Sequence, residues 1–139
     1  MAGTFTMDIS RFCKNANTDI QTVIRKISFE AFKRVVLRTP VDTGRARANW
    51  GVKVGSPTTY IIESEDKSGS ATLAAAQDGV MGWDCTGSIF LCNTLPYISS
   101  LEYGHSKQAP QGMVRLTIEE MQAWIQTNAK KATQIGIPS

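Results

Sequence analysis

A serine, a histidine and a carboxylate occur close together at Glu102, His105 and Ser106, and these side chain types could support nucleophilic catalysis. A catalytic triad requires the histidine to reach the nucleophile while the acid orients the imidazole ring. Residues that are neighbours in one loop rarely meet this requirement. We therefore expect His105, the only histidine, to lie in solvent or at an interface.

The tripeptide Asp42-Thr43-Gly44 occurs in single-domain aspartic proteases of the retroviral type, where two subunits bring together carboxylates that share one proton. In those enzymes the tripeptide follows an apolar strand and precedes a small residue. Here it follows a predicted helix and Pro40, and Arg45 comes next. We expect a turn, because Asp and Thr side chains bond the local backbone and Gly adopts positive φ.

No pattern for a metal or a cofactor is found. The three cysteines, Cys13, Cys85 and Cys92, form no Cys-x-x-Cys pair, and a structural zinc site normally takes four Cys or His ligands. The glycines match neither the Walker nor the Rossmann spacing. We expect reduced thiols rather than a disulfide framework, and no cofactor.

Charge is distributed unevenly along the chain. Residues 1–55 hold ten Lys or Arg and four Asp or Glu, a net +6, whereas residues 56–139 hold five and eight, a net −3. A basic half could contact nucleic acid, or it could meet the acidic half of a neighbouring subunit. No recognised DNA-binding motif is present, so a basic nucleic-acid-binding accessory protein is the alternative function, and it depends on charge alone. The basic residues concerned are Arg25, Lys26, Lys33, Arg34, Arg38, Arg45 and Arg47.

Length and composition predict one globular domain. The chain has 139 residues, of which 42% are hydrophobic and 19% charged. No apolar run approaches the roughly 20 residues that a membrane helix requires, and residues 1–7 have no leader-like pattern. We expect a product of the cytoplasm with no membrane association.

The clearest predicted element is a long helix over residues 18–38, which ends before Pro40. Its apolar side chains recur every three or four residues, as in one face of a helix. They are Ile20, Val23, Ile24, Ile27, Ala31 and Val35, with Phe32 and Leu37 beside them. An N-terminal arm or short helix within residues 1–17 precedes it.

Short elements are predicted between this helix and a long C-terminal helix. We expect strands over residues 48–54, 58–62 and 88–93, and an insertion-like loop region over 63–87 with a short helix at 71–77 that closes at Gly79. A short helix follows at 97–103 and ends at Gly104, and a loop covers 105–112. The last helix covers 113–132, before a loose tail at 133–139. The fold class is α+β, with the N-terminal and C-terminal helices packed on one side of a small, mostly antiparallel sheet.

Two stretches, taken in order, resemble a family. The first motif, residues 39–47, is Thr39-Pro40-Val41-Asp42-Thr43-Gly44-Arg45-Ala46-Arg47. The second motif, residues 96–114, begins with Pro96-Tyr97 and contains Leu101-Glu102-Tyr103-Gly104-His105-Ser106 and Ala109-Pro110-Gln111-Gly112-Met113. The combination, with the closing helix, resembles the tail-completion or neck proteins of tailed bacteriophages over about residues 18–132. Residues 63–87 have no counterpart in this pattern.

The resemblance implies a virion structural protein without catalysis, made in the bacterial host and located at the head–tail junction. The subunit would form a homo-oligomeric ring, expected to be a hexamer, and would contact portal, adaptor or tail proteins. Apart from the resemblance, the basic charge leaves open a non-specific contact with DNA in the channel, and a solvated or intersubunit basic face is the default interpretation. We predict an arginine of one subunit to pair with an acid such as Glu102 of its neighbour. The candidate interface residues are Arg34, Arg38, Asp42, Thr43, Gly44, Arg45, Arg47, Glu102, Tyr103, Gly104, His105, Lys107 and Pro110.

Overall fold

The computed structural model describes residues 20–57, 60–104 and 106–135, with side chains described as far as residue 127. This part of the chain combines helices with a small antiparallel sheet of two strands, as an α+β composition predicts. The elements in chain order are α2 (Ile20–Arg38), α3 (Arg45–Ala48), β1 (Gly51–Val54), α4 (Ser70–Met81), β2 (Ile89–Cys92), α5 (Ile98–Glu102) and α6 (Val114–Ile135).

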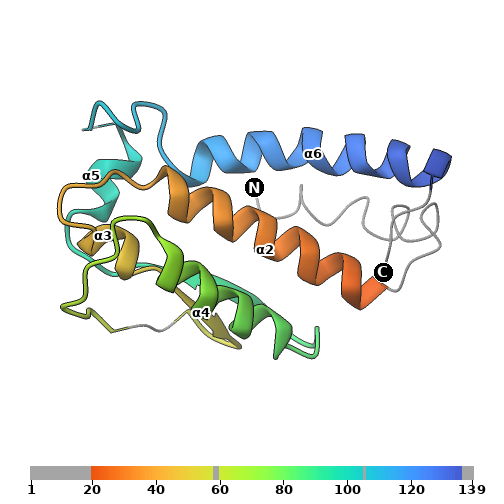
Figure 1. Ribbon diagram of the computed structural model, residues 1–139, viewed down its shortest axis with the longest axis horizontal. Coiled ribbons are helices and arrows are strands. Elements are labelled where there is room, and N and C mark those ends of the chain that lie inside the picture. Colours follow the sequence, from red (N-terminus) through yellow and green to blue (C-terminus); the bar gives the residue numbers. More distant parts are fainter. Residues whose placement is uncertain (1–19, 58–59, 105, 136–139) are drawn as a thin grey trace.

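Helix α2 lies in the middle of the molecule. It packs against α6 on one side and against α4 on the other, and α4 packs in turn on β1 (Figure 1). Direct cover of the sheet therefore comes mainly from α4, whereas the sequence predicts this role for the two long helices. Helix α2 reaches the sheet through Val35, which belongs to a buried cluster. The half-buried Leu91 of β2 packs against this cluster.

The two strands pair so that Gly51 faces Cys92 and Val54 faces Ile89. Helix α4 approaches this pair closely at Gly79, where an added Cβ would lie 3.0 Å from the Val52 Cγ1 atom. The predicted helix end at Gly79 is wrong, because α4 continues to Met81. Gly79 lies inside the helix, and because it has no side chain the helix can pack closely on β1 at this point.

The core joins the ends of the two long helices to the sheet. Val35, Ala109 and Met113 are buried together, and half-buried side chains surround them: Trp50, Leu91, Ile98 and Leu101. Along α6 the buried side chains follow Met113 at intervals of four residues: Thr117, Met121 and Ile125. The apolar Leu116 and Ile118 beside this line are only half-buried. The polar Thr117 is tolerated in the buried line because its hydroxyl donates to the Met113 carbonyl oxygen (2.7 Å).

Several other predicted boundaries change. The strand expected from Ala48 starts at Gly51, because residues 45–48 form α3. Residues 60–62 form no strand. The short helix expected at 71–77 within the region 63–87 is α4, which is longer at both ends. Residues 133–135 belong to α6 rather than to a tail. The predicted arm at 1–17, the first two residues of the predicted long helix, Thr58, Thr59, His105 and residues 136–139 lie outside the described residues.

Candidate functional site

The two sequence motifs meet in space. The Gln108 side chain amide accepts a hydrogen bond from the Val41 N–H (2.9 Å) and donates one to the Val41 carbonyl oxygen (3.0 Å). The motifs together line an open cleft of about 220 Å³. Its walls are formed by Pro40, Val41, Asp42, Thr43, Gly44, Arg45, Ala46, Tyr97, Leu101, Ser106 and Gln108.

This cleft mixes polar and apolar groups. Thr43 and Ser106 provide hydroxyls and Arg45 a guanidinium, while Tyr97 and Leu101 provide apolar surface. Such a mixture suits contact with a polypeptide chain, since protein interfaces combine an apolar centre with hydrogen-bonding groups. We take this cleft as the candidate interface site.

Gly44 shapes one wall of the cleft. Its φ is +92°, and its carbonyl oxygen accepts the Ala48 N–H and the Asp66 N–H (both 3.0 Å). A Cβ at this position would lie 2.6 Å from the Lys67 nitrogen. The turn predicted for Asp42-Thr43-Gly44 is confirmed, and the glycine lets the loop before α4 dock against it. Asp42 and Thr43 are exposed.

Glu102 caps helix α6. Its carboxylate accepts the N–H groups of Met113 (3.0 Å), Val114 (2.8 Å) and Arg115 (3.0 Å), and the Arg115 side chain also donates to it (3.1 Å). Negative charge at a helix N-terminus is stabilising. Burial opposes the charge of Glu102, but these hydrogen bonds outweigh it and lower the pKa of the carboxyl.

Two glycines let the second motif fold around this cap. Both have positive φ, +86° at Gly104 and +87° at Gly112. A Cβ at Gly104 would lie 2.6 Å from the Pro110 carbonyl oxygen, and one at Gly112 would lie 2.5 Å from the Glu102 carbonyl oxygen. The Glu-Tyr-Gly and Pro-Gln-Gly-Met parts of the motif therefore fix the loop that leads into α6.

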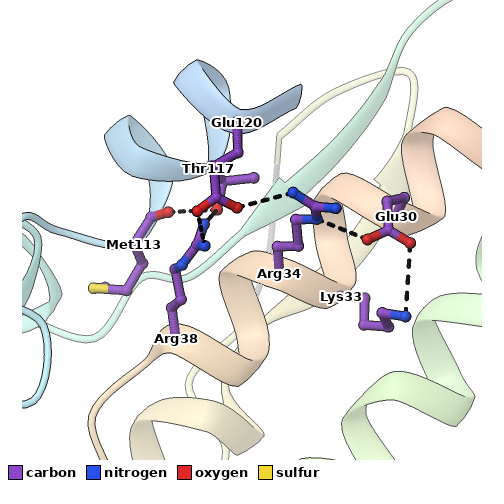
Figure 2. A network of polar contacts seen from close by, with 7 residues as sticks. All are labelled: Glu30, Lys33, Arg34, Arg38, Met113, Thr117 and Glu120. Carbon is purple, nitrogen blue, oxygen red and sulfur yellow. Dashed lines mark hydrogen bonds and ion pairs between the residues drawn. The ribbon is translucent and has the colours of Figure 1, made fainter. Parts of the chain in front are cut away.

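Arg34 and Arg38 connect α2 to α6 (Figure 2). Arg34 donates to Glu30 (2.7 Å) and to Glu120 (2.8 Å). Arg38 donates to the other Glu120 carboxylate oxygen and to the Thr117 hydroxyl (3.0 Å). The hydrogen bond from Arg38 is the largest cause of the lowered pKa of Glu120, and the one to Glu30 is the largest cause of the raised pKa of Arg34.

Arg45 and Arg47 act differently from one another. Arg47 donates to the carbonyl oxygens of Thr39 (3.0 Å), Leu37 (2.7 Å) and Lys67 (2.6 Å), and so ties the end of α2 to the loop before α4. Arg45 lines the cleft and makes one long contact, of 3.4 Å, with the exposed Glu63. Among the described residues, only the Arg45 Nε is a buried side chain polar atom without a hydrogen-bond partner.

The predicted pairing between an arginine and Glu102 of a neighbour stays a prediction. Within one chain, Arg34, Arg38 and Arg47 each bond other groups, and Glu102 bonds Arg115 and the start of α6. Part of the charge asymmetry is met inside the chain, because Glu120, from the acidic half, lies beside the basic helix α2. Arg45 is the remaining predicted arginine that lines the cleft.

The other predicted site residues lie around the second motif. Tyr103 is 67% exposed, and the Arg115 guanidinium lies 4.9 Å from the centre of its ring. Lys107 and Pro110 are exposed in the loop before α6. Pro110 lines a smaller hollow that it shares with Arg38. These residues are therefore near the cleft but do not form its walls.

Three polar residues that the sequence did not single out hold the site together: Asn49, Gln108 and Asp66. The Asn49 amide pairs with both main-chain groups of Ile62. Asp66 accepts the N–H and the hydroxyl of Thr72 (both 2.8 Å) near the start of α4. Burial opposes the charge of Asp66, but these bonds outweigh it and lower its pKa. The only sequence signal was an acid shortly before a helix, and nothing marked the two amides.

Comparison with known proteins gives no relative: no family model, no curated protein and no solved structure matches this chain. In the described part of the chain, no three His, Cys, Asp or Glu side chains gather as metal ligands. None of the described helices is long and apolar enough to cross a membrane.

Proposed function

We propose that this protein is a structural subunit of a tailed-bacteriophage virion that assembles into a homo-oligomeric ring at the head–tail junction. The observation that carries the proposal is the meeting of the two motifs. The resemblance to neck and tail-completion proteins depends on these two motifs, which are about 60 positions apart in the chain. They line one cleft, and the Gln108–Val41 hydrogen bonds join them there. A common surface is what a shared binding role requires.

The roles of individual motif residues also support an assembly function. Gly44, Gly104 and Gly112 permit close approach of main-chain segments, and Glu102 caps α6. These residues fix the shape of two loops that lie over a helical scaffold. Loops held by a rigid scaffold commonly carry binding function.

The proposed partners are other copies of this chain, followed by portal, adaptor or tail proteins. We include in this proposal that the long helices lie on one side of the sheet. The opposite face, which carries Lys53 and Phe90, would then be left for neighbours. Contact with DNA in a channel would be weak, because Glu120 neutralises part of the charge of Arg34 and Arg38.

The test is to introduce a nonsense mutation into the gene for this chain in the phage that encodes it. We expect filled heads and separate tails that fail to join, with joining restored when the chain is supplied in trans. Cryo-electron microscopy of wild-type particles should then locate a ring of this chain at the junction. Normal particles without the chain would contradict the proposal. Retention of the purified chain on DNA at moderate salt would favour the alternative nucleic-acid function.

A further inference from the structure

The sheet has an open edge at β2. The Gly55 N–H donates to the Ser88 carbonyl oxygen (2.9 Å), so this pair marks the hydrogen-bonded positions of the ladder. Because these positions alternate in an antiparallel pair, the main-chain groups of Ile89 and Leu91 point away from β1. In the described residues these groups have no hydrogen-bond partner. An edge of this kind can accept a further strand.

A second segment with open main-chain groups lies in residues 60–65, which follow β1 in the chain and which we call the 60–65 segment. The Asn49 side chain holds both the N–H of Ile62 (2.8 Å) and its carbonyl oxygen (3.1 Å) from one side. The N–H and carbonyl groups of Ile61 and Glu63, on either side of Ile62, have no hydrogen-bond partner among the described residues.

The 60–65 segment exposes side chains that are common in strands. Tyr60 is 84% exposed, Ile61 45% and Ile62 43%. Aromatic and β-branched residues favour paired strands, and a contiguous exposed group of them can mark an interaction site. Figure 1 shows this part of the chain, between β1 and α4, at the periphery of the molecule.

Charge makes the β2 edge and the 60–65 segment complementary. The 60–65 segment contains Glu63, whose side chain is 87% exposed, and Glu65, which is also exposed. Lys53 is exposed and forms no ion pair within the described part of the chain. Lys53 lies on the same face of the sheet as Cys92, since Lys53 faces Phe90 and Gly51 faces Cys92. Burial raises the pKa of the Cys92 thiol, and the Lys53 ammonium partly offsets this effect. A segment added beside β2 would bring its carboxylates towards this ammonium.

We propose that the 60–65 segment of one copy adds as a strand to the β2 edge of the next copy. The inference rests on the proposed ring and specifies the contact that builds it. The β2 edge and the 60–65 segment belong to different parts of one chain, so each copy offers both halves of the contact. Such head-to-tail contacts are heterologous, and they close into a ring when the rotation between copies allows it.

Disulfide trapping to the native Cys92 tests this pairing in the full chain. In a background with Cys13→Ser and Cys85→Ser, single cysteines replace successive residues of the segment, and phage particles carrying each variant are oxidised. The variants are Tyr60→Cys, Ile61→Cys, Ile62→Cys, Glu63→Cys and Ser64→Cys. Denaturing gels without reductant should show a ladder of linked subunits for alternate positions only, because strand side chains alternate between faces. The matched control adds Cys92→Ser, which should abolish every ladder.

The outcomes separate this inference from the proposed function. A ring at the junction with no ladder, or with equal linking at all five positions, would overturn the strand pairing and leave the ring proposal intact. Absence of the chain from particles would overturn both. A ladder with a two-residue period that depends on Cys92 would establish the contact.

A proline substitution gives an independent measurement. Glu63→Pro removes an N–H of the segment that has no partner among the described residues, whereas Glu63→Ala keeps it and removes only the side chain. Native mass measurements of the assembled chain should show affinity between subunits weakened about tenfold or more by the proline and much less by the alanine. Circular dichroism of both variants must match the wild type. Equal effects of the two substitutions would contradict main-chain pairing.

Discussion

Gly44 is the residue whose substitution should disturb the site most directly. A side chain here would both require an unfavourable φ of +92° and collide with the main chain of Asp66 and Lys67. We expect Gly44→Ala to lower the free energy of unfolding by about 3 kcal/mol, since strain and overpacking add. Urea denaturation followed by circular dichroism would measure this change.

Gly55 provides the matched control for that substitution. Its φ is +94°, and an added Cβ would meet nothing within 4 Å. Gly55→Ala therefore isolates the cost of the left-handed conformation, which is about 1 kcal/mol. Equal losses for the two variants would show that the close approach at Gly44 has no energetic importance.

Glu102 should make stability depend on pH. Its pKa is lower in the folded protein than the ordinary value of 4.5, and so is that of Glu120. The ionised forms therefore favour folding, and their contribution is complete above the ordinary value and is lost as pH falls through the folded value. We expect the urea midpoint to decrease between about pH 5 and pH 3, and less so for Glu102→Gln. A parallel decrease in both proteins would exclude Glu102 as a source.

At the scale of elements, the contact between α2 and α6 depends on a partly exposed charge network. Arg38 and Glu120 have 26% and 36% of their side chains exposed, so solvent screens their attraction. A double-mutant cycle with Arg38→Met and Glu120→Gln should give a coupling energy of about 0.5–1 kcal/mol that decreases with salt. Glu119→Gln is the control, because no ion pair of Glu119 occurs among the described residues. A coupling near zero would show that the Arg38–Glu120 pair adds nothing to the contact between the helices.

The predicted elements succeeded where local signals were strong. The strand expected at 88–93 is β2, and the short helix expected at 97–103 is α5, whose end at Gly104 follows from the positive φ there. The predictions failed where packing decided the outcome. The glycine expected to end α4 lies inside it because Val52 is so close, and residues 60–62 pair with the Asn49 side chain instead of a strand.

At the scale of the whole molecule, the chain carries a net charge of +3, but ion pairs reduce the positive charge that α2 presents to a ligand. Glu120 lies between Arg34 and Arg38 and competes with any phosphate for them. We expect Glu120→Gln to elute from heparin at higher salt than the wild type, because freed arginines add to counterion release. Glu119→Gln removes the same charge elsewhere on α6 and is the control. Identical elution of the two variants would show that pairing does not mask the arginines.

The mixed α and β class, the turn at Asp42-Thr43-Gly44 and the loop before α6 could be predicted from the amino-acid sequence, because they depend on local periodicity and on glycine and proline. Which charges meet depends on the folded arrangement of the chain. The pairing of Arg34 and Arg38 with Glu120, the capping of α6 by Glu102, and the Gln108–Val41 link each join groups that are distant along the chain or specific in geometry. Such contacts depend on how helices and loops pack together. Residue type and spacing alone therefore do not predict which side chains meet.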